Sequence, residues 1–157
     1  MAITIRESFE VLASIENVWG YFSEPTQVVP CLPGAELLES MDYNRYRGRV
    51  RIRVGPVVAQ YVGFVHIEQV DPQEHVMIVH ARGDQQGAVG RAEVRISVSL
   101  STLAELRTQV NINSELAVAG RLAQFGSGMI QTVSKQLFRK FAECVQNEMV
   151  AVGEQPT

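Results

Sequence analysis

Apolar and polar residues alternate along most of this chain, and the alternation predicts a β-sheet. From Arg45 to Arg53 every second residue is an arginine, and the residues between them are aliphatic, aromatic or glycine. Because successive side chains of a strand point to opposite faces, this segment is expected to be a strand with one buried and one wet face. The same period of two predicts seven strands, over 3–11, 36–41, 43–54, 57–70, 75–81, 91–100 and 106–118.

The last two of these strands divide their faces in the same way. A polar turn over Gly83 to Gly87 precedes them, and Ala92, Val94 and Ile96 then begin an apolar face opposite Arg91, Glu93 and Arg95. The residues of the final strand that we expect to face inward are Leu106, Thr108, Val110, Ile112, Ser114, Leu116 and Val118.

The last third of the chain has a different period. From Gly120 to Met149 apolar residues recur every three or four positions, which predicts one long amphipathic helix. At about 1.5 Å per residue the helix would be roughly 45 Å long, enough to cross a small domain. Its apolar stripe consists of Leu122, Phe125, Met129, Val133, Leu137, Phe141 and Val145.

Short helices are expected between the first two strands. Ser14 is a suitable N-cap for a helix over 15–23, and the prolines that follow permit at most a turn or two between Thr26 and Val29. The order of elements predicts an α+β fold in which a curved antiparallel sheet wraps around the long helix. We expect one domain over 1–152 and a frayed tail over 153–157.

A sheet curved around a helix leaves room for an apolar cavity. Gly48 and Gly63 on the inner strands, and Gly126 and Gly128 near the start of the helix, add space. A glycine inside a helix costs up to about 1 kcal/mol relative to alanine, so this pair indicates close packing, a distortion or room for a ligand, unless the helix begins only after Gly128. The candidate ligand-binding residues are Trp19, Phe22, Leu32, Tyr46, Val50, Ile52, Tyr61, Val94, Ile96, Val110, Phe125, Met129 and Val133. For each of them, packing in the core is the alternative.

Composition and charge exclude several classes of protein. The formal charge of −3 lacks the basic field that nucleic-acid binders need. The N-terminus has no secretory signal pattern, and no stretch of about 18 apolar residues predicts a membrane span. Cys31 and Cys144 lie far apart and form no metal-ligand spacing, so we expect neither a disulfide framework nor a zinc site. A reducing cytoplasm fits this pattern best.

Three histidines are the main candidates for acid–base or metal chemistry. His66, His75 and His80 do not have a spacing that brings them to one ion, and we expect structural roles for them, with no catalytic and no metal site. Cys31 has no basic neighbour in sequence that would activate it as a nucleophile.

The arginine stripe, which consists of Arg45, Arg47, Arg49, Arg51 and Arg53, has two interpretations. In the first interpretation, the stripe docks an acidic protein surface or anionic lipid headgroups. Alternatively, it forms ordinary pairs with Glu68, Glu93 or Glu115 across the sheet. Two interpretations also apply to residues 28–32, which are either an exposed apolar lip at a cavity mouth or a lid folded over it.

Four sequence strings resemble one family of proteins. They are CLPGAELLE at 31–39, RVRIRVGPVVAQYVGFV at 49–65, EQVDP at 68–72 and GRLAQFGSGMI at 120–130. Their order and spacing, over almost the whole chain, resemble the carbon monoxide dehydrogenase G-subunit (CoxG) family within the helix-grip, START-like (SRPBCC) superfamily. The resemblance implies a seven-stranded helix-grip fold and a non-enzymatic accessory protein of a molybdenum-containing carbon monoxide dehydrogenase or related hydroxylase.

The resemblance also implies a ligand and a location. A lipophilic quinone is the ligand expected in the cavity, and the protein would help to recruit the enzyme to the membrane or to its electron acceptor, as a cytoplasmic protein in peripheral membrane contact. Longer relatives carry an extension suited to membrane attachment, whereas this sequence ends at Thr157, so the resemblance does not by itself support stable anchoring. Two alternatives stay open: a polyketide cyclase/aromatase-like or hydrolase-like enzyme on the same fold, and a ligand-free assembly protein.

Overall fold

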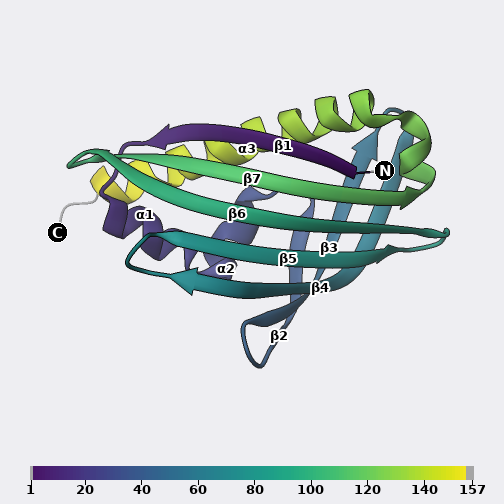
Figure 1. The fold of residues 1–157 in the computed structure, drawn as a ribbon, viewed down its shortest axis with the longest axis horizontal. Helices are drawn as coiled ribbons and strands as arrows, with labels where there is room; N and C mark the ends of the chain where they lie inside the picture. Colours follow the sequence, from purple (N-terminus) through teal and green to yellow (C-terminus); the bar gives the residue numbers. More distant parts are fainter. Residues whose placement is uncertain (1, 155–157) are drawn as a thin grey trace.

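A curved antiparallel sheet and a long terminal helix make up the computed structural model, which describes residues 2–154 and the side chains of residues 2–149 (Figure 1). Within this range the sheet has seven strands in the order β1-β7-β6-β5-β4-β3-β2, and all neighbours are antiparallel. The predicted fold class is therefore confirmed. The strands are β1 (Ala2–Val11), β2 (Ala35–Met41), β3 (Arg45–Val54), β4 (Val57–Asp71), β5 (Val76–Gln85), β6 (Gly90–Ala104) and β7 (Arg107–Gly120).

Short helices fill the connection from β1 to β2, as expected. They are α1 (Ile15–Phe22), α2 (Pro25–Val28) and the 3₁₀ helix η1 (Val29–Cys31). The Ser14 hydroxyl accepts a hydrogen bond from the backbone N–H of Asn17 at 3.3 Å, which confirms Ser14 as the N-cap of α1.

The long helix begins later than the sequence pattern predicts. Residues Arg121–Phe125 form a separate 3₁₀ helix, η2, and Gly126 follows with φ +84°, in the left-handed region that favours glycine. The helix α3 spans Ser127–Glu154, so the prediction of one continuous helix from Gly120 is wrong. At its other end α3 continues to Glu154, into the segment expected to be a frayed tail, and residues 155–157 lie outside the described part.

The break at Gly126 also shifts the buried face of α3. Met129, predicted in the apolar stripe, is 44% exposed, and the next residue, Ile130, is buried instead. The reason is that a 3₁₀ segment and the left-handed Gly126 interrupt the helical rotation, so the predicted stripe misses by one residue in the first turn of α3, whereas its later members Phe141 and Val145 are buried. The buried residues of α3 are Ile130, Phe141, Ala142, Val145 and Met149.

A row of glycines crosses the concave face of the sheet. Gly48 of β3 lies opposite Gly63 of β4, and Gly63 lies opposite Gly83 of β5, which in turn faces Ala92 of β6. A Cβ atom added at Gly63 would overlap the Arg82 carbonyl oxygen, so only glycine permits this approach of the two strands. We call Gly48, Gly63, Gly83 and Ala92 the glycine row, and its small residues favour a bend of the sheet there.

Several strand boundaries differ from the prediction, and two of the differences change residues of the inner face. The strand β5 continues through Gly83 to Gln85, because the glycine belongs to the row rather than to a turn. Leu106, predicted to face inward, is 67% exposed because it lies in the tight turn between β6 and β7.

A disulfide links Cys31 of η1 to Cys144 of α3, with the Cα atoms 5.4 Å apart. The expectation of no disulfide is therefore wrong. It rested on the separation of 113 residues in sequence, whereas pairing depends on distance in the fold. The disulfide also removes the premise on which the cytoplasmic location rested, and that location stays a prediction.

The buried side chains form two separate apolar clusters. The larger one joins α1, η1, the C-terminal part of α3 and the nearby strands, with Val11, Val18, Val110 and Val145 fully buried in it. The smaller one lies around the β3–β4 turn and η2, and includes Val54, Ala59, Tyr61, Val118 and Leu122. We call these the large cluster and the small cluster.

Candidate functional site

The concave face of the sheet changes character between the two clusters. Gly63, Gly83 and their inward-facing neighbours Val65, Ala81 and Val94 are only partly buried and belong to neither cluster. The helix α3 packs mainly on β1, and it makes a smaller contact with β3. The middle of the concave face therefore has small side chains and incomplete cover, which makes it the candidate binding surface.

The predicted ligand-binding residues divide between the clusters and this surface. In the large cluster, or packed against it, are Trp19, Phe22, Tyr46, Ile96 and Val110. In or against the small cluster are Val50, Ile52, Tyr61, Phe125 and Val133. Val94 lies between the two, while Leu32 and Met129 are 39% and 44% exposed and join neither cluster. Core packing thus accounts for most of the set, and ligand binding by these residues stays a prediction.

Two polar groups stand out on this apolar face. The Tyr61 hydroxyl and the Gln85 Oε1 atom are buried and have no hydrogen-bond partner among the described residues. The two residues lie directly opposite each other on β4 and β5, beside the glycine row. Burial raises the pKa of the Tyr61 phenol, so it stays neutral and can donate a hydrogen bond. Sequence patterns missed Gln85 because they placed it beyond the end of its strand.

The other inward hydroxyl groups do not form a catalytic set with a histidine. The Thr108 hydroxyl donates to the Ala13 carbonyl oxygen at 2.8 Å and is fully buried. His66 and His80 lie opposite each other on the outer face of β4 and β5, away from Tyr61 and Thr108. Neither histidine therefore lies in the concave space, where acid–base catalysis would need one. The two histidines give no support to the enzyme alternative.

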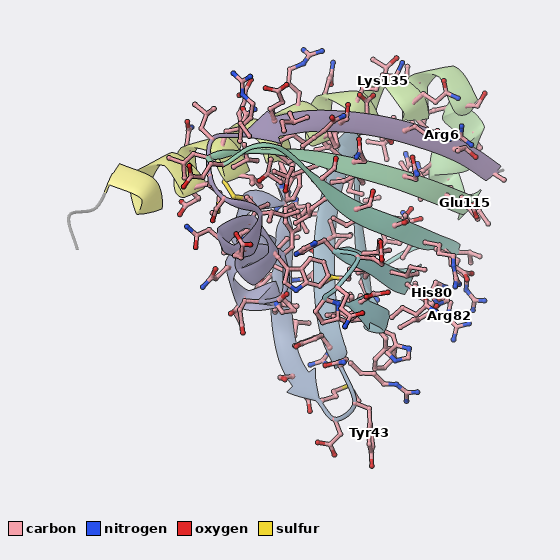
Figure 2. All side chains as sticks on the ribbon, turned by 60° about the vertical axis from the view of Figure 1, so that its left-hand side comes forward. Arg6, Tyr43, His80, Arg82, Glu115 and Lys135 are labelled. Atoms are coloured by element: carbon pink, nitrogen blue, oxygen red, sulfur yellow. A yellow bond between two sulfur atoms is a disulfide. The ribbon has the colours of Figure 1, made fainter. Side chains whose placement is uncertain are left out.

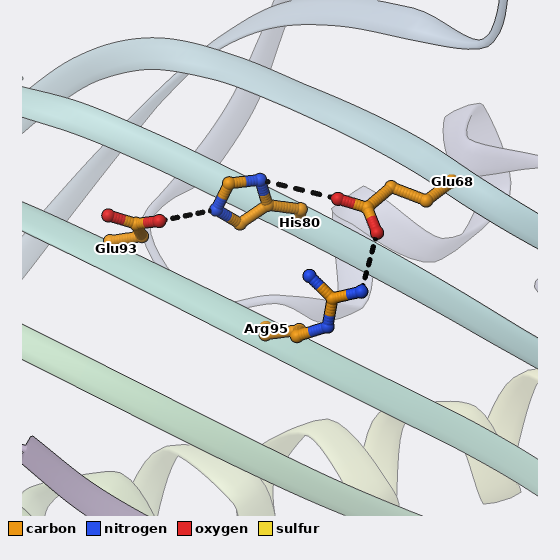
Figure 3. A network of polar contacts seen from close by, with 4 residues as sticks. All are labelled: Glu68, His80, Glu93 and Arg95. Carbon is orange, nitrogen blue, oxygen red and sulfur yellow. Dashed lines mark hydrogen bonds and ion pairs between the residues drawn. The ribbon is translucent and has the colours of Figure 1, made fainter.

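His80 instead belongs to a polar network on the outer face (Figure 3). Its Nε2 atom lies 2.6 Å from Glu93 Oε1, and its Nδ1 atom lies 3.5 Å from Glu68 Oε1. Glu68 also accepts a hydrogen bond from the Arg95 Nη2 atom at 2.8 Å. The hydrogen bond from His80 lowers the pKa of Glu93. No group of residues among those described has the composition and spacing of a metal site.

His75 has a different environment. Its ring packs edge-on against the Trp19 indole, with 5.5 Å between the ring centroids. This contact fits the structural role that the sequence predicted.

The arginine stripe is only partly paired. Arg47 pairs with Glu39 at 3.5 Å and Arg49 pairs with Glu36, so the partners come from β2. The predicted partners were wrong, since Glu68 and Glu93 bind Arg95 and His80 instead. No ion pair involves Arg45, Arg51 or Arg53 among the described residues.

Apolar side chains accompany the stripe on the outer face. Phe64, 55% exposed, lies between Arg47 of β3 and Arg82 of β5 in the register of the sheet. Val58, 41% exposed, lies opposite Arg53. Arg82 projects from the outer face together with His80 and Glu115 (Figure 2). This surface combines unpaired cations with exposed apolar groups.

The segment over residues 28–32 is mostly folded down. Val28 packs against the large cluster and Cys31 is buried in its disulfide, while Leu32 stays partly exposed. No helix among residues 2–154 combines the length and apolar composition that crossing a membrane requires.

The sequence matches one family model over most of its length. The model is that of the G subunit of carbon monoxide dehydrogenase (CoxG), and it matches residues 8–150. A search of the curated protein sequences found no match.

Several solved structures have the same fold. A conserved protein from Geobacillus kaustophilus superposes with a TM-score of 0.85 at 21% identity, covering 95% of this chain and 96% of its own. The ZhuI aromatase/cyclase from Streptomyces sp. R1128 gives 0.68 at 15% identity, covering 95% and 94%. A START superfamily protein from Mycobacterium smegmatis gives 0.61 at 15% identity, covering 95% and 98%. At these identities the likeness extends to the fold alone.

Proposed function

This chain belongs to the carbon monoxide dehydrogenase G-subunit (CoxG) family, and from that membership we propose a function for its concave face. The protein acts as a non-enzymatic accessory protein of a molybdenum-containing carbon monoxide dehydrogenase or related hydroxylase. It binds a lipophilic, quinone-like ligand between the sheet and α3. It thereby helps to bring the enzyme to the membrane or to its electron acceptor, on the cytoplasmic side and in peripheral contact.

The observation that carries this proposal is the pair of buried polar groups on an otherwise apolar face. Leaving a buried polar group without a partner costs about 1–3 kcal/mol, so Tyr61 and Gln85 favour a ligand that supplies the missing partner. A quinone carbonyl oxygen would accept from the Tyr61 hydroxyl, whereas Gln85 Oε1 is itself an acceptor and would pair with an O–H of the reduced quinol. The quinone's hydrocarbon chain would lie over the glycine row and against Val65, Ala81 and Val94.

The outer face supports the recruiting part of the proposal. Arg51, Arg53 and Arg82 form no ion pair within the described part of the chain. The exposed Phe64 lies opposite Arg82, and the exposed Val58 lies opposite Arg53. Such a surface suits a partner that is acidic and partly apolar. The concave ligand surface and this outer surface lie on opposite sides of one sheet, so a bound enzyme would not cover the ligand.

Ligand binding is tested with a soluble quinone. Trp19 is the only tryptophan and packs against the large cluster, so its fluorescence reports binding of decyl-benzoquinone. We expect Tyr61→Phe to weaken quinone binding by about twofold to tenfold, because a hydrogen bond contributes about 0.5–1.5 kcal/mol. Binding of decylbenzene, which has the chain without the carbonyl groups, should not change.

Two outcomes would contradict the proposal. If the purified chain binds neither compound, and extraction from its own host yields no lipophilic molecule, it is a ligand-free assembly protein. If Tyr61→Phe weakens both compounds equally, the phenol acts by packing and not by recognising the carbonyl group. Val58→Ala, on the outer face of the same strand, is the matched control and should bind both compounds normally.

A further inference from the structure

We propose that a cleft between α1, η1 and the C-terminal part of α3 binds a small organic ammonium ion. The cleft has a volume of about 590 Å³ and is lined by no residue of the sheet, so it is separate from the concave face. Its lining residues are Glu16, Asn17, Gly20, Tyr21, Gln27, Pro30, Cys31, Glu148 and Met149. In Figure 1, α1 and the C-terminal part of α3 lie at the same end of the molecule.

The charges in this cleft are all of one sign. Glu16 of α1 and Glu148 of α3 face it, and it is lined by no lysine or arginine. Neither carboxylate takes part in an ion pair among the described residues. Two unpaired carboxylates, contributed by two helices to one partly enclosed cleft, attract a cation.

Tyr21 supplies an independent observation at the floor of the cleft. Its side chain is only 7% exposed, and its hydroxyl is buried with no hydrogen-bond partner among the described residues. Burial, and then the nearby Glu148 carboxylate, raises the pKa of Tyr21 to about 12. The phenol is therefore neutral, and its oxygen can accept a hydrogen bond from an N–H donor.

The lining also decides between an organic cation and a metal ion. Hard metal ions such as Ca²⁺ take six or more oxygen ligands, and the described residues contain no group of three or more Asp, Glu, His or Cys side chains that could hold a metal ion. A volume of about 590 Å³ far exceeds what a bare ion needs, and Pro30 and Met149 add apolar wall for methylene groups. An ammonium group on a short hydrocarbon chain matches the carboxylates, the phenol and the apolar wall together.

The disulfide holds the walls of this cleft together. Cys31 lines the cleft from η1, and its partner Cys144 lies four residues, about one helical turn, before Glu148 on α3. The crosslink therefore fixes η1 against the stretch of helix that carries one of the two carboxylates. The site is preorganised for its ligand, which reduces the entropy lost on binding.

Calorimetry with the full chain tests the site. At low salt we expect 1,4-diaminobutane to bind, and butane-1,4-diol, which has the same length without charge, not to bind. Tyr21→Phe should weaken diamine binding by about tenfold to a hundredfold, since hydrogen bonds to charged groups contribute about 1.5–3 kcal/mol. The variant should fold normally, because it removes a buried hydroxyl that has no partner in the described part of the chain.

A second pair of variants separates the site from general charge effects. Glu148→Gln should weaken diamine binding at least as much as Tyr21→Phe. Glu143→Gln, also on α3 but outside the cleft, should bind like the wild type. Equal binding of the diamine and the diol, equal losses in the two glutamate variants, or competition by Mg²⁺ at matched ionic strength would each overturn the proposal. None of these outcomes depends on quinone binding at the concave face.

Discussion

The two faces of the sheet differ in whether their polar side chains have partners. On the outer face His80, Glu68, Glu93 and Arg95 are partly exposed, and each has a polar partner. On the concave face Tyr61 belongs to the small apolar cluster, and the buried oxygens of Tyr61 and Gln85 have no partner in the described part of the chain. Water can solvate the outer groups if their pairs break, but it reaches the concave groups poorly.

This difference indicates where binding is expected to change the free energy most. Exposed ion pairs contribute only about 0–1 kcal/mol, so replacing one partner on the outer face has little effect. A buried polar group without a partner destabilises the free protein. A ligand that supplies the partner recovers that free energy on binding. The same argument applies to Tyr21 in the cleft beside α1.

The largest expected effect comes from adding one methyl group to the concave face. In Gly63→Ala the new Cβ overlaps the Arg82 carbonyl oxygen, so the strands must separate or the bend must flatten. We expect a loss of about 2–3 kcal/mol in the free energy of unfolding, measured by urea denaturation.

The adjacent residue on the opposite face is the control. Val62→Ala removes two methyl groups from a half-buried side chain and should cost no more than about 1 kcal/mol. If the two variants are equally destabilised, the glycine row does not set the curvature of the sheet.

The division into faces was predictable from sequence, whereas the features that shape the site were not. Alternation depends only on neighbouring residues, so the period of two alone placed Tyr46, Val50 and Tyr61 correctly on the inner face. The opposition of Gly63 to Gly83 depends on register between strands, which a single sequence does not contain. The pairing of Cys31 with Cys144 was also missed, because 113 residues separate them in the chain and only the fold brings them together.

The start of the long helix α3 was the other feature that the sequence pattern predicted wrongly. The apolar period continued from Leu122 to Val145 and hid the break at Gly126. Two glycines close together were a signal for that break, and the alternative of a later helix start was nearer the structure. Gln85 was missed because the turn expected at Gly83 ended its strand too early.

A smaller effect separates an unpartnered from a partnered hydroxyl on the same concave face. Tyr61→Phe removes a hydroxyl that has no partner among the described residues, so the free energy of unfolding should stay unchanged or rise by up to about 1 kcal/mol. Thr108→Val removes the donor to the Ala13 carbonyl oxygen and should lower it by about 1–2 kcal/mol. A clear loss in Tyr61→Phe would mean that the phenol already has a partner, and the argument for a ligand there would fail.

The smallest effect is expected on the outer face, and it depends on pH. The hydrogen bond from His80 lowers the pKa of Glu93 below the ordinary carboxyl value of 4.5. A carboxyl whose pKa is lower in the folded state contributes stability above its unfolded pKa, and this contribution is lost as the pH falls through the folded pKa. Glu93→Gln should therefore be slightly less stable than the wild type at about pH 6, and the difference should shrink in acid.

Urea midpoints at several pH values measure this difference, with Glu115→Gln as the control on the neighbouring strand. Glu115 forms no ion pair with any described residue, so its replacement removes a surface charge without removing a contact of the His80 kind. A pH-dependent difference of the same size in both variants would show that general surface charge, and not the His80 contact, is responsible. The outer face would then resemble any wet sheet surface, and the contrast with the concave face would rest on the buried oxygens of Tyr61 and Gln85 alone.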